Sequence, residues 1–146
     1  MGLLGLLTVL YLVQEQHALA ISLLRLSKHD TQHFPLCVLL INLTRLAVVA
    51  LRRGFLNRAA NRRLALLPVL CELFTGLSSR FLDIWSRGKT IRESGFVLRE
   101  LEEMTNSSSL CENLINCFKK QTDCSPQGVG KEARGFMNVC EEEPGV

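Results

Sequence analysis

The stretch LPVLCELFTGLSSRFLDIW, residues 67–85, has the clearest periodicity in this sequence of 146 residues. Its apolar side chains recur three and four residues apart, which is the repeat of one face of an α-helix. Pro68 suits the first turn of a helix, and Gly76 permits close packing against a neighbour. The pattern covers fewer than three heptads, which favours a helical bundle over a coiled coil. The apolar positions are Leu67, Leu70, Phe74, Leu77, Phe81 and Ile84.

The segment before this stretch predicts a second amphipathic helix. Residues 35–53 repeat apolar side chains at the helical period. Gly54 follows the basic pair Arg52 and Arg53, a combination typical of a helix C-terminus. The polar residues 57–63 that follow are expected to form a connection without apolar periodicity.

The N-terminal segment is almost wholly apolar. We expect a helix from about Leu3 to Arg25 that is interrupted by a polar break at residues 14–17. Because helices that are apolar all round are usually buried, this helix is predicted to be a central element. An alternative hypothesis uses residues 1–13 as a signal or membrane anchor. The segment is short, and it lacks both a preceding basic residue and a cleavage pattern, which favours the buried helix.

The C-terminal third predicts short helices and then a tail. Residues Thr90–Glu93 and Ser109–Glu112 both have the capping-box pattern that marks a helix start. From residue 121 onward apolar periodicity vanishes, which predicts a mobile acidic tail over residues 121–146. The expected organisation is therefore one domain over residues 1–104, a short helix over 105–120 and the tail.

The fold class follows from these patterns and from the composition. Hydrophobic residues make up 47% of the chain, which is enough for a core. Leucine dominates, and no segment has the alternation of a β-strand. The sequence predicts an all-α fold, an irregular bundle of about five helices with a disordered C-terminal tail.

Six cysteines raise the alternative of a secreted, disulfide-bonded protein. Cys37 and Cys71 lie in apolar helical segments, where a free thiol behaves as a small core residue. No C-x-x-C pair occurs, and no histidine completes a zinc-like spacing. We therefore expect reduced thiols, no metal site and a cytoplasmic location.

Six arginines and no acidic residue occur between Arg45 and Arg63. Three interpretations of this cluster stay open at this point. The first is a solvated helix face with no partner. The second is a surface that binds an acidic protein or anionic lipid headgroups. The third is a nucleic-acid site. Stacking aromatics are scarce around it, so nucleic acid is the least favoured and no nucleic-acid partner is predicted.

Motifs that would indicate catalysis do not occur. The sequence contains no phosphate-binding G-x-x-x-x-G-K-[ST] loop, no G-x-S-x-G turn and no H-E-x-x-H pair. The prediction is a protein that is not itself an enzyme and that binds no cofactor.

Several segments, in order, resemble the ELMO-domain family, and most closely its third paralogue group. Residues 1–7, MGLLGLL, followed by Tyr11, resemble the end of the family's signature. Phe34–Pro35 and residues 41–45, INLTR, resemble its next helix, and residues 89–102, KTIRESGFVLRELE, resemble its C-terminal end. The resemblance covers about residues 1–103, so residues 1–104 are expected to be a partial ELMO domain.

The resemblance implies a GTPase-activating regulator of Arf and Arf-like small GTPases, with membrane or cytoskeletal association. Such activators insert an arginine beside the transferring phosphate. In the family signature this arginine stands two positions before the residue that aligns with Met1, so weak or no GTPase activation is expected. The candidate contacts with the GTPase are Gly2, Gly5, Leu6 and Arg45. The alternative function is a non-enzymatic protein-interaction module.

Overall fold

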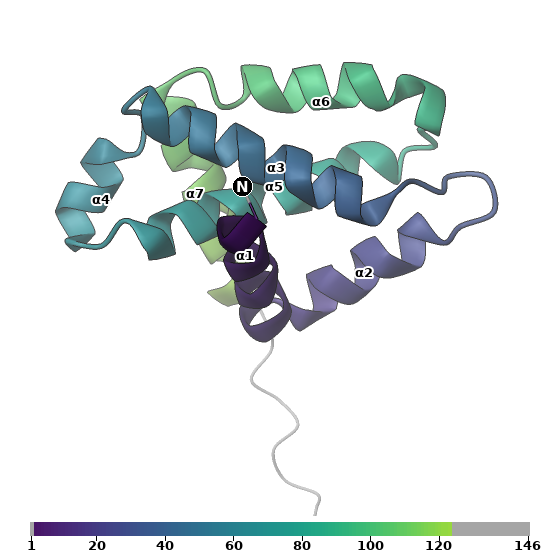
Figure 1. Ribbon diagram of the computed structural model, residues 1–146, viewed down its shortest axis with the longest axis horizontal. Helices are drawn as coiled ribbons and strands as arrows, with labels where there is room; N and C mark the ends of the chain where they lie inside the picture. Colours follow the sequence, from purple (N-terminus) through teal and green to yellow (C-terminus); the bar gives the residue numbers. More distant parts are fainter. Residues whose placement is uncertain (1, 124–146) are drawn as a thin grey trace, which may run out of the picture.

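The computed structural model describes residues 2–123, and this part of the chain contains seven α-helices, a short 3-10 turn and no β-strand (Figure 1). The predicted all-α fold is confirmed, with more helices than the expected five. The elements are α1 Gly2–Glu15, α2 His17–Ser27, α3 Leu36–Arg52, α4 Asn57–Arg63, α5 Leu67–Trp85, the 3-10 turn Ile91–Glu93, α6 Ser94–Glu103 and α7 Ser108–Asp123.

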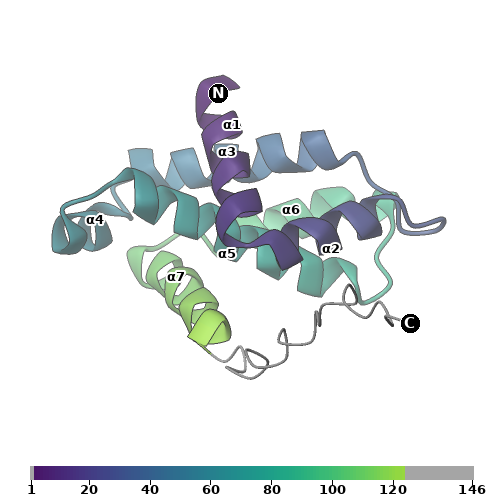
Figure 2. The same ribbon diagram turned by 90° about the horizontal axis from the view of Figure 1, so that it is seen from below.

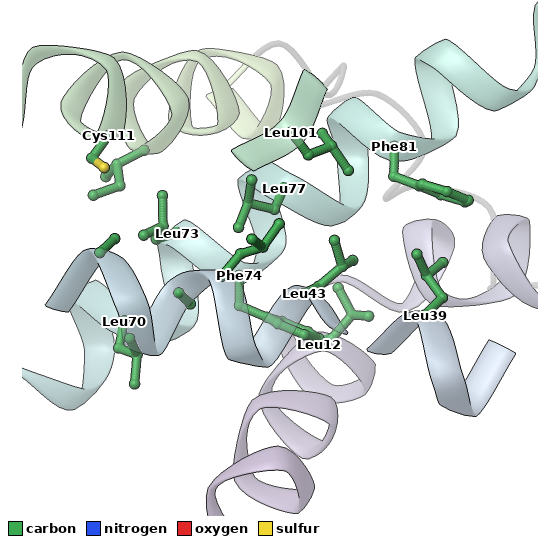
Figure 3. Packing of buried hydrophobic residues seen from close by; sticks show 14 of the residues in the cluster. Leu12, Leu39, Leu43, Leu70, Leu73, Phe74, Leu77, Phe81, Leu101 and Cys111 are labelled. Atoms are coloured by element: carbon green, nitrogen blue, oxygen red, sulfur yellow. The ribbon is translucent and has the colours of Figure 1, made fainter. Parts of the chain in front are cut away.

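Helix α5 forms the centre of the fold, and its apolar periodicity correctly predicted the helix. Twelve of its residues are buried, and it packs against α1, α2, α3, α6 and α7. Figure 3 shows Phe74 and Leu77 of α5 among side chains from the surrounding helices. These neighbours include Leu12, Leu43, Leu101 and Cys111.

Gly76 brings α7 close to α5, which confirms the predicted close packing at this glycine. A Cβ atom at Gly76 would lie 2.9 Å from the carbonyl oxygen of Leu114, closer than real Cβ contacts. The backbone of α7 therefore rests directly on α5 at this position. Any side chain larger than hydrogen would force the two helices apart.

Three aromatic rings join the connection between α2 and α3 to the end of α5. Phe34 lies edge-on to Phe81 and Trp85, with ring centroids 5.1 and 5.3 Å away. The indole Nε1 of Trp85 donates to the carbonyl oxygen of Gln32 at 2.7 Å. The amide Nε2 of Gln32 donates to the carbonyl oxygen of Trp85 at 3.0 Å. The ring cluster and the reciprocal hydrogen bonds fix this connection against the core.

The N-terminal segment departs from the prediction of one buried, central helix. Its polar break is a sharp bend, with Gln16 between α1 and α2 and an angle of 111° between the two helices. Only Thr8 and Leu12 of α1 are buried. The prediction of burial is wrong because α5 occupies the centre and α1 packs against it along one face only.

Membrane-spanning potential is limited in the described residues. No single helix there is long and apolar enough to cross a membrane. The bent pair of α1 and α2 meets the criterion of length and composition only when the two are taken together.

Helix α4 replaces the connection that was predicted for residues 57–63. Its sequence, NRAANRR, has no apolar repeat, but alanine and arginine are good helix formers. Only Ala59 is buried, so local propensity rather than burial accounts for most of this helix. Because α4 has no apolar stripe, helical periodicity in the sequence could not predict this helix.

The two predicted capping boxes have different outcomes. At Thr90 the box is confirmed, with the side chain of Glu93 accepting from the backbone N–H of Thr90 at 3.1 Å. The second is misplaced, because α7 begins at Ser108 and the hydroxyl of Ser107 accepts from the N–H of Leu110 at 3.2 Å. Helix α7 continues to Asp123, so most of the predicted tail lies outside the described residues.

Candidate functional site

One face of α1 is apolar and uncovered. Leu6 is 70% exposed, and its neighbours on this face recur at the helical period. Figure 2 shows α1 projecting from the body formed by the other helices. An apolar stripe of this kind is typical of a surface that meets a partner. Its residues are Leu3, Leu6, Leu7, Leu10 and Val13, and we call it the α1 face.

The opposite side of α1 anchors the helix to the body. The hydroxyl of Thr8 lies 3.2 Å from that of Thr44 in α3, and both side chains are buried. Each hydroxyl also lies near a carbonyl oxygen of its own helix, 2.8 Å from Leu40 for Thr44 and 2.9 Å from Gly5 for Thr8, so either hydroxyl can donate to the other. Leu12, one helical turn further, is buried in the core. A hydrogen bond and apolar packing therefore position the α1 face.

Gly2 and Gly5 have no packing reason of their own, although Gly5 lies on the same stripe of α1 as the buried Thr8 and Leu12. A Cβ atom added at either glycine would meet no atom within 4 Å in the described part of the chain. Glycine inside a helix is less stable than alanine by roughly 0.8–1.0 kcal/mol. The missing Cβ atoms therefore bring no benefit inside the described fold, whereas they would let a partner approach the helix backbone closely.

Near the C-terminal end of α1, Tyr11 lies close to the ion pair of Arg63 and Glu72. Burial raises the pKa of Tyr11, and the nearby Glu72 carboxylate raises it further. Arg63, at the end of α4, forms an ion pair with Glu72. The phenol thus stays protonated at neutral pH, and α1 is held near the start of α5 by a neutral, partly buried ring.

The structure brings three of the four candidate contacts together. Gly2, Gly5 and Leu6 share α1, whereas Arg45 is exposed on α3. Arg45 lines a separate polar groove of about 230 Å³ between α3 and α6, which also contains Glu102. All four contacts remain predictions. Sequence reasoning identified Gly2, Gly5 and Leu6 but not the other side chains of the α1 face, although their three- and four-residue spacing was a readable signal.

The described residues offer little to a metal or to covalent chemistry. Over residues 2–123 no group of three or more His, Cys, Asp or Glu side chains is placed to hold a metal ion. The predicted burial is found for Cys71, but Cys37 is exposed because it lies on the outer side of α3. Cys124 and Cys140 lie outside the described residues.

The thiols are expected to differ sharply in reactivity. Burial raises the pKa of Cys111 to about 11 and also raises that of Cys71, so neither supplies the reactive thiolate at neutral pH. Iodoacetamide at neutral pH should therefore modify the exposed Cys37 and Cys117 before the buried Cys71 and Cys111. Peptide mass mapping with and without denaturant measures the difference. Equal rates at Cys111 and Cys37 would show that α7 is not packed, and finding all six thiols free would remove the disulfide alternative.

The fold and the α1 face define a class: a compact all-α module with an exposed apolar helix available to a partner. The model of the ELMO/CED-12 family matches residues 1–98. The chain belongs to the ELMO/CED-12 family. The resemblance found in its sequence motifs is thereby confirmed.

Curated relatives agree with this assignment. The chain is 41% identical to the ELMO domain-containing protein 3 of Bos taurus, with 96% of this chain and 41% of the relative covered. Identity is 39% to the Mus musculus protein of the same name, with the same coverage. It is 38% to the Homo sapiens protein, over 73% of this chain and 29% of the relative. The chain thus spans less than half the length of the relatives it matches, and no solved structure matches it.

Proposed function

We propose that this chain is a regulatory module for Arf or Arf-like small GTPases that binds its GTPase through the α1 face, in the cytoplasm. Two findings support the proposal. The chain belongs to the ELMO/CED-12 family, for which the motif resemblance implies such GTPases. The motif positions Gly2, Gly5 and Leu6 share one helix whose apolar face is uncovered. The second finding is the observation that carries the proposal.

We further propose that these 146 residues bind the GTPase with little or no acceleration of GTP hydrolysis. Helix α1 contains no arginine, and Arg45 lies in a different groove. An arginine finger must reach the transferring phosphate from a pre-organised position, and it contributes roughly 10³–10⁵ in rate. The α1 face offers apolar contact and an open backbone, which suit binding rather than stabilisation of charge.

Two measurements test this proposal on the full chain. Calorimetric titration against a panel of Arf and Arf-like GTPases, loaded with GDP or with a non-hydrolysable GTP analogue, should detect binding to at least one member. Single-turnover GTP hydrolysis by that GTPase should change little when the chain is added in excess. A failure to bind any member contradicts the proposal. Acceleration on the scale of an arginine finger would retain the GTPase assignment and overturn the second part.

Gly5→Ala should separate stability from binding. The change should raise the free energy of unfolding by roughly 0.5–1 kcal/mol, because α1 loses a helix-interior glycine and the new methyl meets open space. Affinity for the GTPase should fall about tenfold, the scale of one added methyl group in a tight contact. Gly95→Ala on α6 is the matched control, since that position is also open. Unchanged affinity in Gly5→Ala would show that no partner approaches the backbone there.

The second candidate function is a non-enzymatic interaction module. The exposed leucines of the α1 face favour it, since one such face could cover another. Sedimentation velocity across a range of concentrations tests self-association, with Leu6→Glu as the disrupting variant. A monodisperse monomer at all concentrations would exclude self-association through this face.

A further inference from the structure

A second apolar feature, apart from the α1 face, lies at the end of the molecule where α4 turns into α5. Figures 1 and 2 both show α4 at one extremity of the fold. Leu64, directly after α4, is 94% exposed, and Leu66 and Leu67 are each 46% exposed. We call residues 57–67 the α4 corner. Three leucines at one protruding tip of a chain with a well-filled core require an explanation.

The backbone at the tip holds the Leu64 side chain outward. Leu64 has φ 52°, in the left-handed region, and it is the one residue other than glycine with positive φ in the described part of the chain. This conformation ends α4, and the N–H of Ala65 donates to the carbonyl oxygen of Ala60 at 3.2 Å. Glycine or asparagine would end the helix with less strain. The leucine side chain adds only exposed apolar surface to the described fold.

Positive charge surrounds this tip. Arg52 and Arg53 end α3 next to the corner, and α4 adds three more arginines without an acidic residue. Glu112 lies 3.7 Å from Arg58 and 3.6 Å from Arg62, and Glu72 pairs with Arg63. Together these five arginines and two carboxylates carry an excess of three positive charges.

The arginines remain available despite these ion pairs. The side chains of Arg58 and Arg62 are 75% and 61% exposed, and both lie beyond hydrogen-bond distance of the Glu112 carboxylate, so they stay open to solvent. Arg53 donates to the neutral amide oxygen of Asn106 at 2.7 Å and keeps its charge uncompensated by that contact. The corner therefore combines an apolar tip with a largely exposed basic rim.

We propose that the α4 corner docks on an anionic lipid bilayer. In this arrangement Leu64 enters the boundary between headgroups and acyl chains, with Leu66 and Leu67 at its edge. The arginines meet lipid phosphates and carboxylates. A protruding apolar tip with flexible basic side chains suits a fluid surface that closes around it. The proposal stands on the geometry of α4 and is independent of GTPase binding by the α1 face.

Neither a nucleic acid nor an acidic protein fits the corner as well. Binding to single-stranded nucleic acid relies on aromatic side chains that stack on bases, and residues 57–67 contain none. A specific protein interface needs an apolar anchor that fills a partner's pocket and a rim of fixed polar contacts. Here the rim consists of exposed, weakly held arginines. These alternatives become outcomes of the test.

Vesicle co-sedimentation of the full chain tests the charge requirement. We expect binding to vesicles of phosphatidylcholine with phosphatidylserine, little binding to phosphatidylcholine alone, and release by salt. Arg52→Gln with Arg58→Gln should weaken binding about fivefold for each arginine removed. The matched control pair Arg87→Gln with Arg92→Gln removes the same charge from exposed sites at the far end of α5. Equal losses in both pairs would show non-specific attraction and overturn the proposal.

Two substitutions at Leu64 test the insertion. Leu64→Asn suits the left-handed backbone, so the fold is retained, and vesicle binding should fall about tenfold. Phe96→Asn, at a side chain 72% exposed on α6, is the control that removes apolar surface elsewhere. Leu64→Trp should show a blue-shifted emission with vesicles and quenching by brominated lipid, against the buried Trp85 as a constant background.

Two kinds of result would overturn the proposal. Full binding by Leu64→Asn, or an unquenched tryptophan at position 64, would overturn the insertion. Binding to single-stranded RNA or to an acidic polypeptide in preference to anionic vesicles would assign the corner to that partner and overturn the membrane proposal.

Discussion

Trp85→Ala is expected to lower the free energy of unfolding by about 3–5 kcal/mol, the usual cost of truncating a buried aromatic residue. Trp85 is fully buried, and its ring lies 5.0 Å from that of Phe81 and 5.3 Å from that of Phe34. The loss also removes the indole donor to Gln32. A domain of this size has a total stability of about 5–15 kcal/mol, so a large part of it depends on this ring.

Urea unfolding followed by circular dichroism measures the effect, because the variant lacks the only tryptophan in the chain. Trp85→Phe separates the two contributions. It keeps most of the ring packing and loses the hydrogen bond, so it should cost roughly 1–3 kcal/mol. Phe96→Ala, at an exposed ring, should change stability by about 0.5 kcal/mol or less. A Trp85→Ala loss as small as that of Phe96→Ala would contradict the described core.

Periodicity predicted the helices that carry a regular apolar repeat. The three- and four-residue spacing of apolar side chains in residues 67–85 located α5, and Gly76 marked a position of close packing. The central position itself had been expected of the N-terminal segment instead. The capping box at Thr90 was also predicted, since its two hydrogen bonds are local. Helix α4 was not predicted, because it depends on local helix propensity and has almost no core contact.

Exposure was harder to predict than helix type. The start of α1 is apolar on all sides, so its sequence cannot distinguish the face that packs on α3 and α5 from the face that stays open. That choice depends on the bend at Gln16 and on which helix occupies the centre. Leu64 illustrates the same limit, because its exposure follows from a left-handed backbone that glycine or asparagine would ordinarily mark.

The candidate site was predictable only in part for a related reason. The family resemblance identified Gly2, Gly5 and Leu6, and their shared helix placed them together. Arg45 was grouped with them by the motif alone. Its side chain turns toward α6, about 100° around α3 from Thr44, which meets α1. A one-residue difference in register along α3 thus separates two surfaces that the linear motif had joined.

Gly76→Ala is expected to destabilise the protein by about 1–3 kcal/mol, although alanine is the better helix former. The new Cβ would lie 2.9 Å from the carbonyl oxygen and 3.2 Å from the carbonyl carbon of Leu114. These are backbone atoms, so no rotation of a side chain relieves the contact and α7 must move away from α5. The close contact outweighs the gain in helix propensity, which is roughly 1 kcal/mol.

Gly5→Ala is the matched comparison, because it places the same methyl group in a helix with no atom within 4 Å. The two variants should shift the unfolding midpoint in opposite directions in thermal or urea unfolding. Separation of α7 should also expose the buried thiol of Cys111, whose alkylation should accelerate in Gly76→Ala and stay slow in Gly5→Ala. Stabilisation by both substitutions, with Cys111 still protected, would mean that α7 does not rest on α5 at Gly76. The amphipathic pattern of residues 67–85 would then describe only the side of α5 that faces α1, α3 and α6.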